Sequence, residues 1–151
     1  MKIANTLKVL KDLLKINTDR VEDYRKGSAN AGETDLKPVL KNIADESRKN
    51  IAQLEGEIKK HGGESEASEL TPEGKIIKAW MEFKAAFTGH DRESVLDSVE
   101  QGYDKAIEGY RVAIASTDLS SEVRQLVRNQ SQGLETSHVI IKDLKDNPTG
   151  E

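Results

Sequence analysis

The segment IANTLKVLKDLLKINTDRVEDY, residues 3–24, repeats its apolar side chains with the period of a helix. They recur at intervals of three and four residues, and the members are Ile3, Leu7, Leu10, Leu14, Val21 and Tyr24. Asn17 stands where one further apolar residue would complete the series. Because residues three and four apart share one face of an α-helix, the spacing predicts an amphipathic helix over residues 3–29.

Four later segments also carry helical patterns. The predicted helices cover residues 3–29, 35–61, 72–87, 91–116 and 121–146. Gly62-Gly63 follows the second helix as a C-terminal stop. Ser120 or Ser121 caps the last helix. No segment alternates apolar and polar residues as a half-buried strand does, which predicts an all-α fold.

The lengths of the connections predict how these helices assemble. Short connections make the first two helices and the last two antiparallel hairpins. Residues 63–89 are long enough to run the length of the bundle, and Thr71-Pro72 starts the short helix within them. Two hairpins joined by one long crossover define the ferritin-like arrangement. We therefore expect one domain over residues 1–151, a ferritin-like four-helix bundle with a short extra helix in its crossover segment.

The amino-acid composition limits which partners and which kinds of site chemistry we expect. Apolar residues make up 35% and charged residues 33% of the 151 residues, at a net charge of −4, which suits a narrow core under a charged surface. No basic face is clustered, so nucleic acid is not an expected partner. Lysines interrupt the N-terminal segment and the longest apolar run is Val112–Ala115, so we expect a cytoplasmic protein without a membrane partner. The absence of cysteine excludes thiolate chemistry.

Several stretches form a recognisable set, and they are VLKDLLK (9–15), IAQLEGEIKKHGG (51–63), GKIIKAWMEFKAAFTGHD (74–91), VEQGYDKAIEGY (99–110) and VRQLVRNQ (123–130) with His138 beyond it. With these stretches the chain resembles a family of small bacterial four-helix-bundle proteins in the ferritin-like superfamily, catalogued mainly as a domain of unknown function. The resemblance covers nearly the whole chain. It implies the fold and a bacterial source, and it implies no particular activity.

The fourth predicted helix contains a Glu-x-x-His pair, which is a metal-binding spacing. Ferritin-like di-iron proteins use one glutamate from each of two helices and a Glu-x-x-His pair from each of the other two. The candidate ligands for iron or manganese in this chain are Glu22, Glu46, Glu100, Glu135 and His138, with Asp45 as the alternative to Glu46 on the second helix. Counted along the helices, Glu22, Glu46, Glu100 and His138 fall at about the same level of the predicted bundle and could share one layer.

The second helix breaks this ligand pattern. Lys49 stands three residues after Glu46, where a histidine is needed, and its ammonium group repels a metal ion. The partial set suits one metal ion, or two weakly bound ones, and argues against ferroxidase or oxygenase chemistry. Surface pairing is the alternative for two carboxylates, because Glu22 precedes Lys26 and Asp45 precedes Lys49 by four residues.

The polar residues at core positions also have structural interpretations. His138 lies between apolar positions, where a hydrogen bond to Glu100, Gln130 or a tyrosine would satisfy it without metal. The residues that interrupt the apolar seams near mid-bundle are Asn17, Ser47, Asn50 and Gln130. Pairing among them would fix the register of the helices, and lining a small polar cavity is the alternative. His61 and His90 adjoin glycines and are expected to face solvent.

The short helix over residues 72–87 carries an aromatic stripe of Trp80, Phe83 and Phe87. Covering the bundle accounts for a stripe with this period. Ile77 and Met81 widen the apolar face, which favours a homodimer contact as the alternative.

Three functions follow from these patterns. The first is a non-catalytic or weakly metal-binding bundle that acts through oligomer or partner contacts in stress physiology. The second is a divergent di-iron or di-manganese carboxylate enzyme, either a ferroxidase or a peroxide-consuming protein. The third is a helical adaptor that binds no metal. We rank them in this order, because the second helix lacks the histidine that a complete two-metal site needs.

Overall fold

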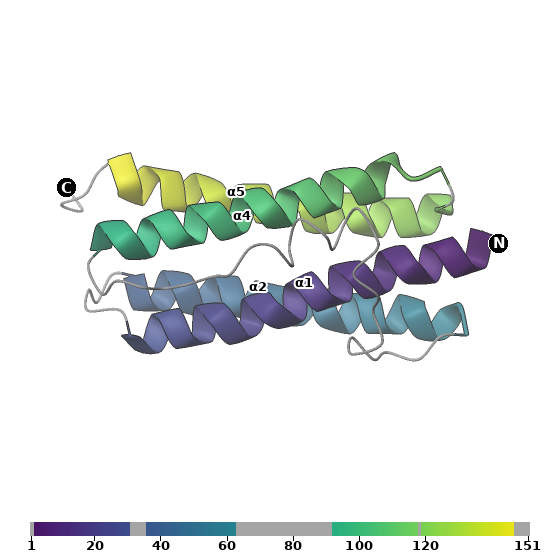
Figure 1. Cartoon of the computed structure of the whole chain (residues 1–151), viewed down its shortest axis with the longest axis horizontal. Coiled ribbons are helices and arrows are strands. Elements are labelled where there is room, and N and C mark those ends of the chain that lie inside the picture. Colours follow the sequence, from purple (N-terminus) through teal and green to yellow (C-terminus); the bar gives the residue numbers. More distant parts are fainter. Residues whose placement is uncertain (1, 31–35, 63–91, 118, 147–151) are drawn as a thin grey trace.

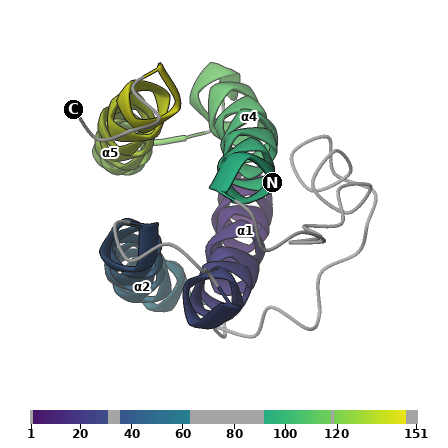
Figure 2. The same ribbon diagram turned by 90° about the vertical axis from the view of Figure 1, so that its left-hand side faces the viewer.

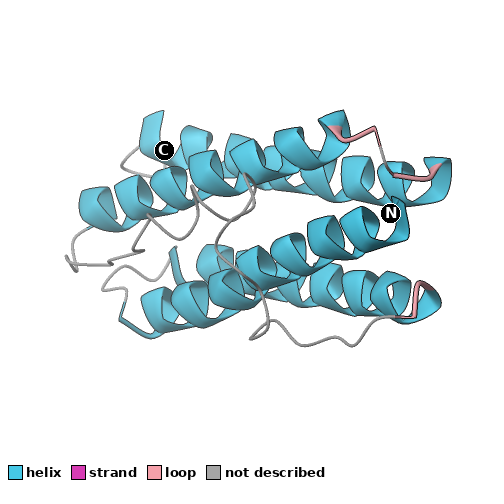
Figure 3. Ribbon diagram, turned by 45° about the vertical axis from the view of Figure 1, so that its right-hand side comes forward, coloured by secondary structure: helices cyan, strands magenta, loops and turns pink. Residues whose placement is uncertain are grey.

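The computed structural model of the chain describes residues 2–30, 36–62, 92–117 and 119–146. Nearly all of these residues belong to α-helices, and no strand occurs among them (Figure 3). The helices are α1 (Lys2–Asn30), α2 (Leu36–Lys60), α4 (Arg92–Ala115) and α5 (Ser121–Asp146). The predicted all-α class is therefore confirmed, and the predicted ends of these four helices are correct to within about one residue. The helix and the aromatic stripe expected over residues 72–87 lie outside the described residues.

The four helices pack side by side as a bundle. In Figure 1, α1 and α5 run in one direction, and α2 and α4 run in the other. Viewed along its length, the bundle has a helix at each corner, with α1 next to both α2 and α4, and α5 next to the same two helices (Figure 2). Each helix is therefore antiparallel to both of its neighbours. None of the helices in the described ranges has both the length and the apolar character needed to cross a bilayer.

The buried apolar side chains form two clusters. At the end of the bundle where α2 finishes, the Gly62-end cluster contains Val9, Leu10, Leu13, Leu14, Ile16, Leu54, Ile58, Ala106, Ile107, Tyr110, Ala113, Leu119, Val123, Val127 and Leu134. At the other end, the Leu36-end cluster contains Tyr24, Leu36, Leu40, Ile43, Ala44, Val95, Leu96, Val99 and Ile141. Full burial of one such side chain contributes roughly 1.5–3 kcal/mol. The candidate site is built around five of the buried polar side chains, Asn17, Arg20, Ser47, Asn50 and Gln130.

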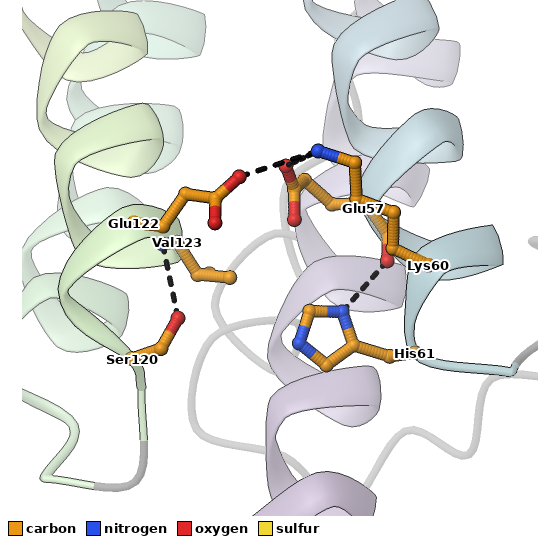
Figure 4. A network of polar contacts seen from close by, with 6 residues as sticks. All are labelled: Glu57, Lys60, His61, Ser120, Glu122 and Val123. Atoms are coloured by element: carbon orange, nitrogen blue, oxygen red, sulfur yellow. Dashed lines mark hydrogen bonds and ion pairs between the residues drawn. The ribbon is translucent and has the colours of Figure 1, made fainter.

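The predicted helix-end signals are confirmed where the structure describes them. Gly62 adopts a left-handed backbone with φ of 79°, and its N–H donates to the Lys59 carbonyl at 3.0 Å, which ends α2. The Ser120 hydroxyl accepts the Val123 N–H at 3.2 Å and so caps α5 (Figure 4). Close by, Lys60 Nζ contacts both Glu57 Oε1 at 3.3 Å and Glu122 Oε1 at 3.2 Å, which links α2 to α5.

His61 and Arg124 secure the same end of the bundle. The Nδ1 atom of His61 lies 2.8 Å from the Glu57 carbonyl oxygen, so this half-buried ring is tied to its own helix (Figure 4). The expectation that His61 faces solvent is therefore only partly correct. The Arg124 guanidinium donates to the Ser116 carbonyl at 2.8 Å and also to the Ile114 carbonyl, which holds the connection between α4 and α5 against the helix that follows.

The buried face of α1 is wider than the predicted one, because Val9, Leu13 and Ile16 are also buried, and Leu7 is only half-buried. Val21 is half-buried, whereas Arg20 is buried with 2% of its surface exposed. Arg20 fits the helical period as well as Val21 does, because it is three residues after Asn17 and four before Tyr24. The prediction that Val21 occupies this buried position is therefore wrong, because Arg20 occupies it.

Candidate functional site

Asn17 is the centre of a hydrogen-bond network in the middle of the bundle. Its Nδ2 group donates to the Leu13 carbonyl at 2.8 Å and to the Tyr110 hydroxyl at 2.9 Å. Its Oδ1 atom accepts a hydrogen bond from Asn50 Nδ2 at 3.2 Å. One amide side chain thus connects α1 to α2 and α4.

Tyr110 and Gln130 extend the network to the fourth helix. The Tyr110 hydroxyl donates to Gln130 Oε1 at 2.7 Å. Gln130 Nε2 donates in turn to the Asn50 carbonyl at 3.3 Å and to Gln53 Oε1 at 3.0 Å. Burial raises the pKa of the Tyr110 phenol, so Tyr110 stays a neutral donor. The predicted pairing is confirmed for Asn17, Asn50 and Gln130, with Tyr110 as the connecting residue that the helical pattern alone did not single out. It is not confirmed for Ser47, whose described hydrogen bond is to Arg20.

Arg20 lies one turn along α1 from this network, on the side of the Leu36-end cluster. Its Nε donates to the Ser47 hydroxyl at 3.3 Å, and its guanidinium carbon lies 5.0 Å from the centroid of the Tyr24 ring. The Nη1 atom is buried and has no hydrogen-bond partner. A buried cation that keeps an unused donor is costly in free energy, so this side chain is a conspicuous feature of the core.

A small pocket adjoins Arg20 and takes side chains from all four helices. Its lining residues are Arg20, Tyr24, Ile43, Val99, Tyr103, Leu134, Ser137, His138 and Ile141. The opening has room for about one water molecule. The pocket is therefore lined by both polar and apolar side chains, and it is too small for an organic cofactor.

His138 forms one wall of this pocket. Its ring stacks on Tyr103 with centroids 4.0 Å apart and an interplanar angle of 5°. Its Nε2 atom lies 4.0 Å from Glu100 Oε2, which is an ion-pair distance rather than a hydrogen bond. Lys145 Nζ contacts the other oxygen of Glu100 at 3.2 Å and also reaches Asp97 at 2.8 Å. The contacts described for the His138 ring are therefore the stacked Tyr103 ring and the Glu100 carboxylate, rather than a hydrogen bond.

Glu46 reaches the site from α2. Its Oε2 atom accepts a hydrogen bond from the Ser137 hydroxyl at 2.8 Å, while Oε1 is buried without a partner. Burial raises the pKa of Glu46, against the opposing effects of the Ser137 hydrogen bond and of the Arg20 and Lys49 charges. A Cβ atom on Gly133 would lie 3.7 Å from Oε2, in ordinary contact, so the carboxylate fits closely against α5.

The other predicted ligands do not join this group. Glu22 is exposed and contacts Arg25 at 3.8 Å. Glu135 is also exposed, and Asp45 pairs with Arg48 at 2.6 Å on the surface. Within the described parts of the chain, no three histidine or acidic side chains are arranged to hold a metal ion. The structure brings Glu100 close to His138 and places Glu46 against Ser137, but it separates the Glu-x-x-His pair, because Glu135 faces outward.

Asp12 is an isolated acidic group in the core, apart from this site. It is 1% exposed, and its Oδ1 atom has no hydrogen-bond partner. Burial raises its pKa from 3.8 to about 6, although the Lys8 charge lowers it. Because the folded-state pKa exceeds the unfolded value, the folded state binds the proton first as the pH falls from about 6 to about 4. Asp12 therefore destabilises the fold above that window, and the penalty is relieved within it.

Replacing Asp12 with asparagine is expected to raise the free energy of unfolding at pH 7 by on the order of 1–3 kcal/mol. The variant should also lose the gain in stability that the wild type shows as the pH falls from about 6 to about 4. Urea unfolding at a series of pH values measures both effects, with Asp104→Asn on the exposed face of α4 as the matched control. Equal pH profiles for Asp12→Asn and the wild type would contradict the assignment.

The fold and the site together define an all-α four-helix bundle with a polar layer and a buried arginine in its core. Residues 5–116 match the model of the family described as Domain of unknown function (DUF2383), and the chain belongs to this family. The match covers most of α1 with all of α2 and α4, and it ends before α5, so Gln130, Ser137 and His138 lie beyond it. A comparison with the curated proteins finds no match to the chain.

Proposed function

We propose that this chain is a ferritin-like four-helix bundle that lacks a two-metal centre and acts by contact with other protein chains rather than by catalysis. The observation that carries the proposal is the burial of Arg20 between the two apolar clusters. Arg20 lines one pocket together with Ser137 and His138. A fixed positive charge takes the place that metal cations occupy in a di-iron bundle.

The helix directions support the ferritin-like assignment. The end of α2 and the beginning of α4 lie at opposite ends of the bundle, so these two helices are parallel to each other (Figure 1). Bundles joined only by short loops alternate in direction from one helix to the next, whereas a parallel second and third helix requires one long connection. That order of directions is the one that ferritin-like proteins use.

The residues present do not fit a pair of metal ions. Such a centre needs about six inward ligands, with a Glu-x-x-His pair on each of two helices. Here Glu22 and Glu135 face solvent, and Glu100 already contacts Lys145. The charge of Arg20 would also repel a cation bound near Glu46 or His138. We therefore assign the polar layer a structural role.

Oxygen consumption tests the non-catalytic part of the proposal. When ferrous iron is added to the anaerobically prepared protein and oxygen is then admitted, we expect the same rate of uptake as with ferrous iron in buffer alone. His138→Ala serves as the comparison and should behave in the same way. Faster uptake by the wild type that His138→Ala abolishes would instead support the di-iron or di-manganese enzyme.

A single weakly bound divalent ion is the second candidate, because one contact favours it. Glu100 Oε2 and His138 Nε2 lie 4.0 Å apart, and an ion between them would have one oxygen and one nitrogen ligand. Lys145 competes for Glu100, so this reading predicts that Lys145→Met strengthens zinc or manganese binding measured by calorimetry. Unchanged binding in that variant would exclude the second candidate.

Val139 and Ile140 on α5 form the contact surface that we propose. They are 66% and 52% exposed, and they adjoin each other on the outer face of the helix. Glu135 lies one turn before Val139 and Lys142 about one turn after it. In an antiparallel contact between two copies, Glu135 of one copy would approach Lys142 of the other, so the surface is complementary to itself. The proposed occupant is therefore a second copy of the chain, through α5 rather than through Ile77 and Met81, which lie outside the described residues.

Substituting Val139 with glutamate is expected to weaken this homodimer by at least about tenfold, because the new carboxylate would be desolvated at the contact. Sedimentation equilibrium of the wild type and of Val139→Glu measures the change. Ala52→Glu, an exposed site on α2, is the matched control and should dimerise like the wild type. A monomeric wild type, or a dimer that Val139→Glu leaves unchanged, would refute the proposed surface.

A further inference from the structure

We propose that Arg20 and Glu46 form one buried charge pair, and that this pair holds the second half of α5 on the bundle through Ser137. The three residues, which we call the Arg20–Glu46–Ser137 latch, come from α1, α2 and α5. The latch is independent of the proposed contact between two copies, because that contact uses Val139 and Ile140 on the outer face of α5. It gives the buried charges a conformational role, which is to position this helix.

Arg20 and Glu46 reach the same part of the core from neighbouring helices. Arg20 Nε donates to the hydroxyl of Ser47, the residue after Glu46 on α2, at 3.3 Å. Arg20 also lines the core pocket with Ser137, and the Ser137 hydroxyl donates to Glu46 Oε2 at 2.8 Å. Burial raises the pKa of Glu46, and the Ser137 hydrogen bond and the Arg20 charge both act against that rise. The two charges are therefore close enough to interact.

Each member of the pair keeps one buried polar atom without a hydrogen-bond partner. This atom is the Nη1 donor on Arg20 and the Oε1 acceptor on Glu46. Both atoms carry a desolvation cost, and the attraction between opposite buried charges offsets part of it. The charge of Lys49 also acts on Glu46, but Lys49 is exposed and solvent screens its effect. Arg20 is thus the buried counter-charge of Glu46.

One turn of α5 receives the Glu46 carboxylate. Gly133 and Ser137 are four residues apart, so they lie on the same face of the helix. A Cβ atom on Gly133 would lie 3.7 Å from Glu46 Oε2, which places the carboxylate directly against this turn. Ser137 then supplies the donor, and a hydrogen bond to an ionised carboxylate is stronger than one between neutral groups. The charge on Glu46 therefore strengthens the contact between α2 and α5.

The latch acts on the second half of α5 in particular. Contacts of Glu122 and Gln130 already join the first half of this helix to α2. In the second half, Lys145 contacts acidic side chains that belong to α4. The hydrogen bond from Ser137 to Glu46 reaches across to α2 instead. Loss of the latch is therefore expected to loosen residues 137–146 more than the rest of the bundle.

The pKa of Glu46, followed through the NMR shift of its side-chain carboxyl carbon, tests the charge pair. Arg20→Met should raise this pKa above the wild-type value, because the opposing positive charge is removed. Arg48→Met, on the exposed face of α2, is the matched control and should leave the pKa of Glu46 unchanged. An equal pKa of Glu46 in Arg20→Met and in the wild type would overturn the proposal.

A double-mutant cycle on thermal unfolding tests the same pair by its stability. The Tm lost on Arg20→Met should be about 3 °C smaller in Glu46→Gln protein than in the wild type, because no counter-charge is then left to lose. The exposed pair of Asp45 and Arg48 is the control, and the effects of Asp45→Asn and Arg48→Met on Tm should be additive. Additive effects at Arg20 and Glu46 would contradict the charge pair.

Hydrogen exchange tests the hold on α5, and it stays valid where Arg20→Met fails to fold. In Ser137→Ala, the backbone amides of residues 138–144 should exchange about tenfold faster than in the wild type. Thr136→Ala is the matched control, because Thr136 is exposed and its hydroxyl donates to the Gln132 carbonyl of the same helix at 3.0 Å. Equal exchange in the two variants would overturn the latch. So would equal acceleration in all four helices, which would indicate a global loss of stability.

Discussion

Replacing Asn17 with leucine is expected to lower the free energy of unfolding by about 3 kcal/mol. Leucine has the same number of side-chain heavy atoms and the same branching, so the main cost comes from the groups that lose their partner. Asn50 Nδ2 loses its hydrogen-bond acceptor, and the Tyr110 hydroxyl oxygen loses the hydrogen bond that Asn17 donates to it. Each buried polar group left unsatisfied costs roughly 1–3 kcal/mol.

Urea unfolding followed by circular dichroism measures this change in stability. Asn129→Leu on α5 is the matched control, because Asn129 is exposed and its described hydrogen bond is to Gln125 within the same helix. We expect the control to change the free energy of unfolding by less than about 0.5 kcal/mol. If the two variants lost the same amount of stability, the Asn17 network would have no special role in the core.

Replacing Leu134 with alanine is the second substitution for which we expect a large effect. Leu134 is 1% exposed, belongs to the Gly62-end cluster and also lines the Arg20 pocket. Removing its buried methyl groups should lower the free energy of unfolding by about 3 kcal/mol, within the roughly 2–5 kcal/mol found for such changes. The pocket should also become larger, since surrounding side chains relax only partly around a new cavity.

Ile140→Ala provides the comparison for Leu134→Ala on the same helix. Ile140 is 52% exposed, so its truncation should cost less than about 0.5 kcal/mol in monomeric protein. Unfolding at low protein concentration separates this effect from any dimer contact. A loss below about 1 kcal/mol for Leu134→Ala would mean that α5 packs on the bundle much more loosely than its burial indicates.

The arrangement of the helices was largely predictable from the sequence. The three-and-four spacing of apolar residues, as in Leu7, Leu10 and Leu14, depends on local geometry alone, and it gives helices whose ends are nearly correct. Gly62 and Ser120 mark helix ends through equally local chemistry. The pairing of Asn17 with Asn50 also followed, because polar residues on facing apolar seams at one level must satisfy each other.

The candidate site was less predictable, because it depends on which way individual side chains turn. Arg20 and Val21 are neighbours that both fit the buried stripe, and spacing alone could not assign the inner position to the cation. Glu135 and His138 share a motif spacing, yet Glu135 is exposed while His138 stacks on Tyr103.

The buried polar layer favours one arrangement of the four helices over others. An all-apolar core would tolerate shifts of one helix against another, whereas the contacts among Asn17, Asn50, Tyr110 and Gln130 are satisfied in one register only. We infer that Arg20 adds to this selection through Ser47 and Tyr24. Its desolvation reduces stability, as polar groups retained for specificity commonly do.

The metal content of the protein tests the central claim most directly. Wild type and His138→Ala are incubated anaerobically with ferrous iron or manganese, desalted, and measured by mass spectrometry. The account predicts well below one metal ion per chain in both proteins. The reasons are that the buried positive charge of Arg20 repels a cation and that Glu22 and Glu135 face solvent. About two metal ions per chain in the wild type, lost in His138→Ala, would contradict it and identify a divergent two-metal protein.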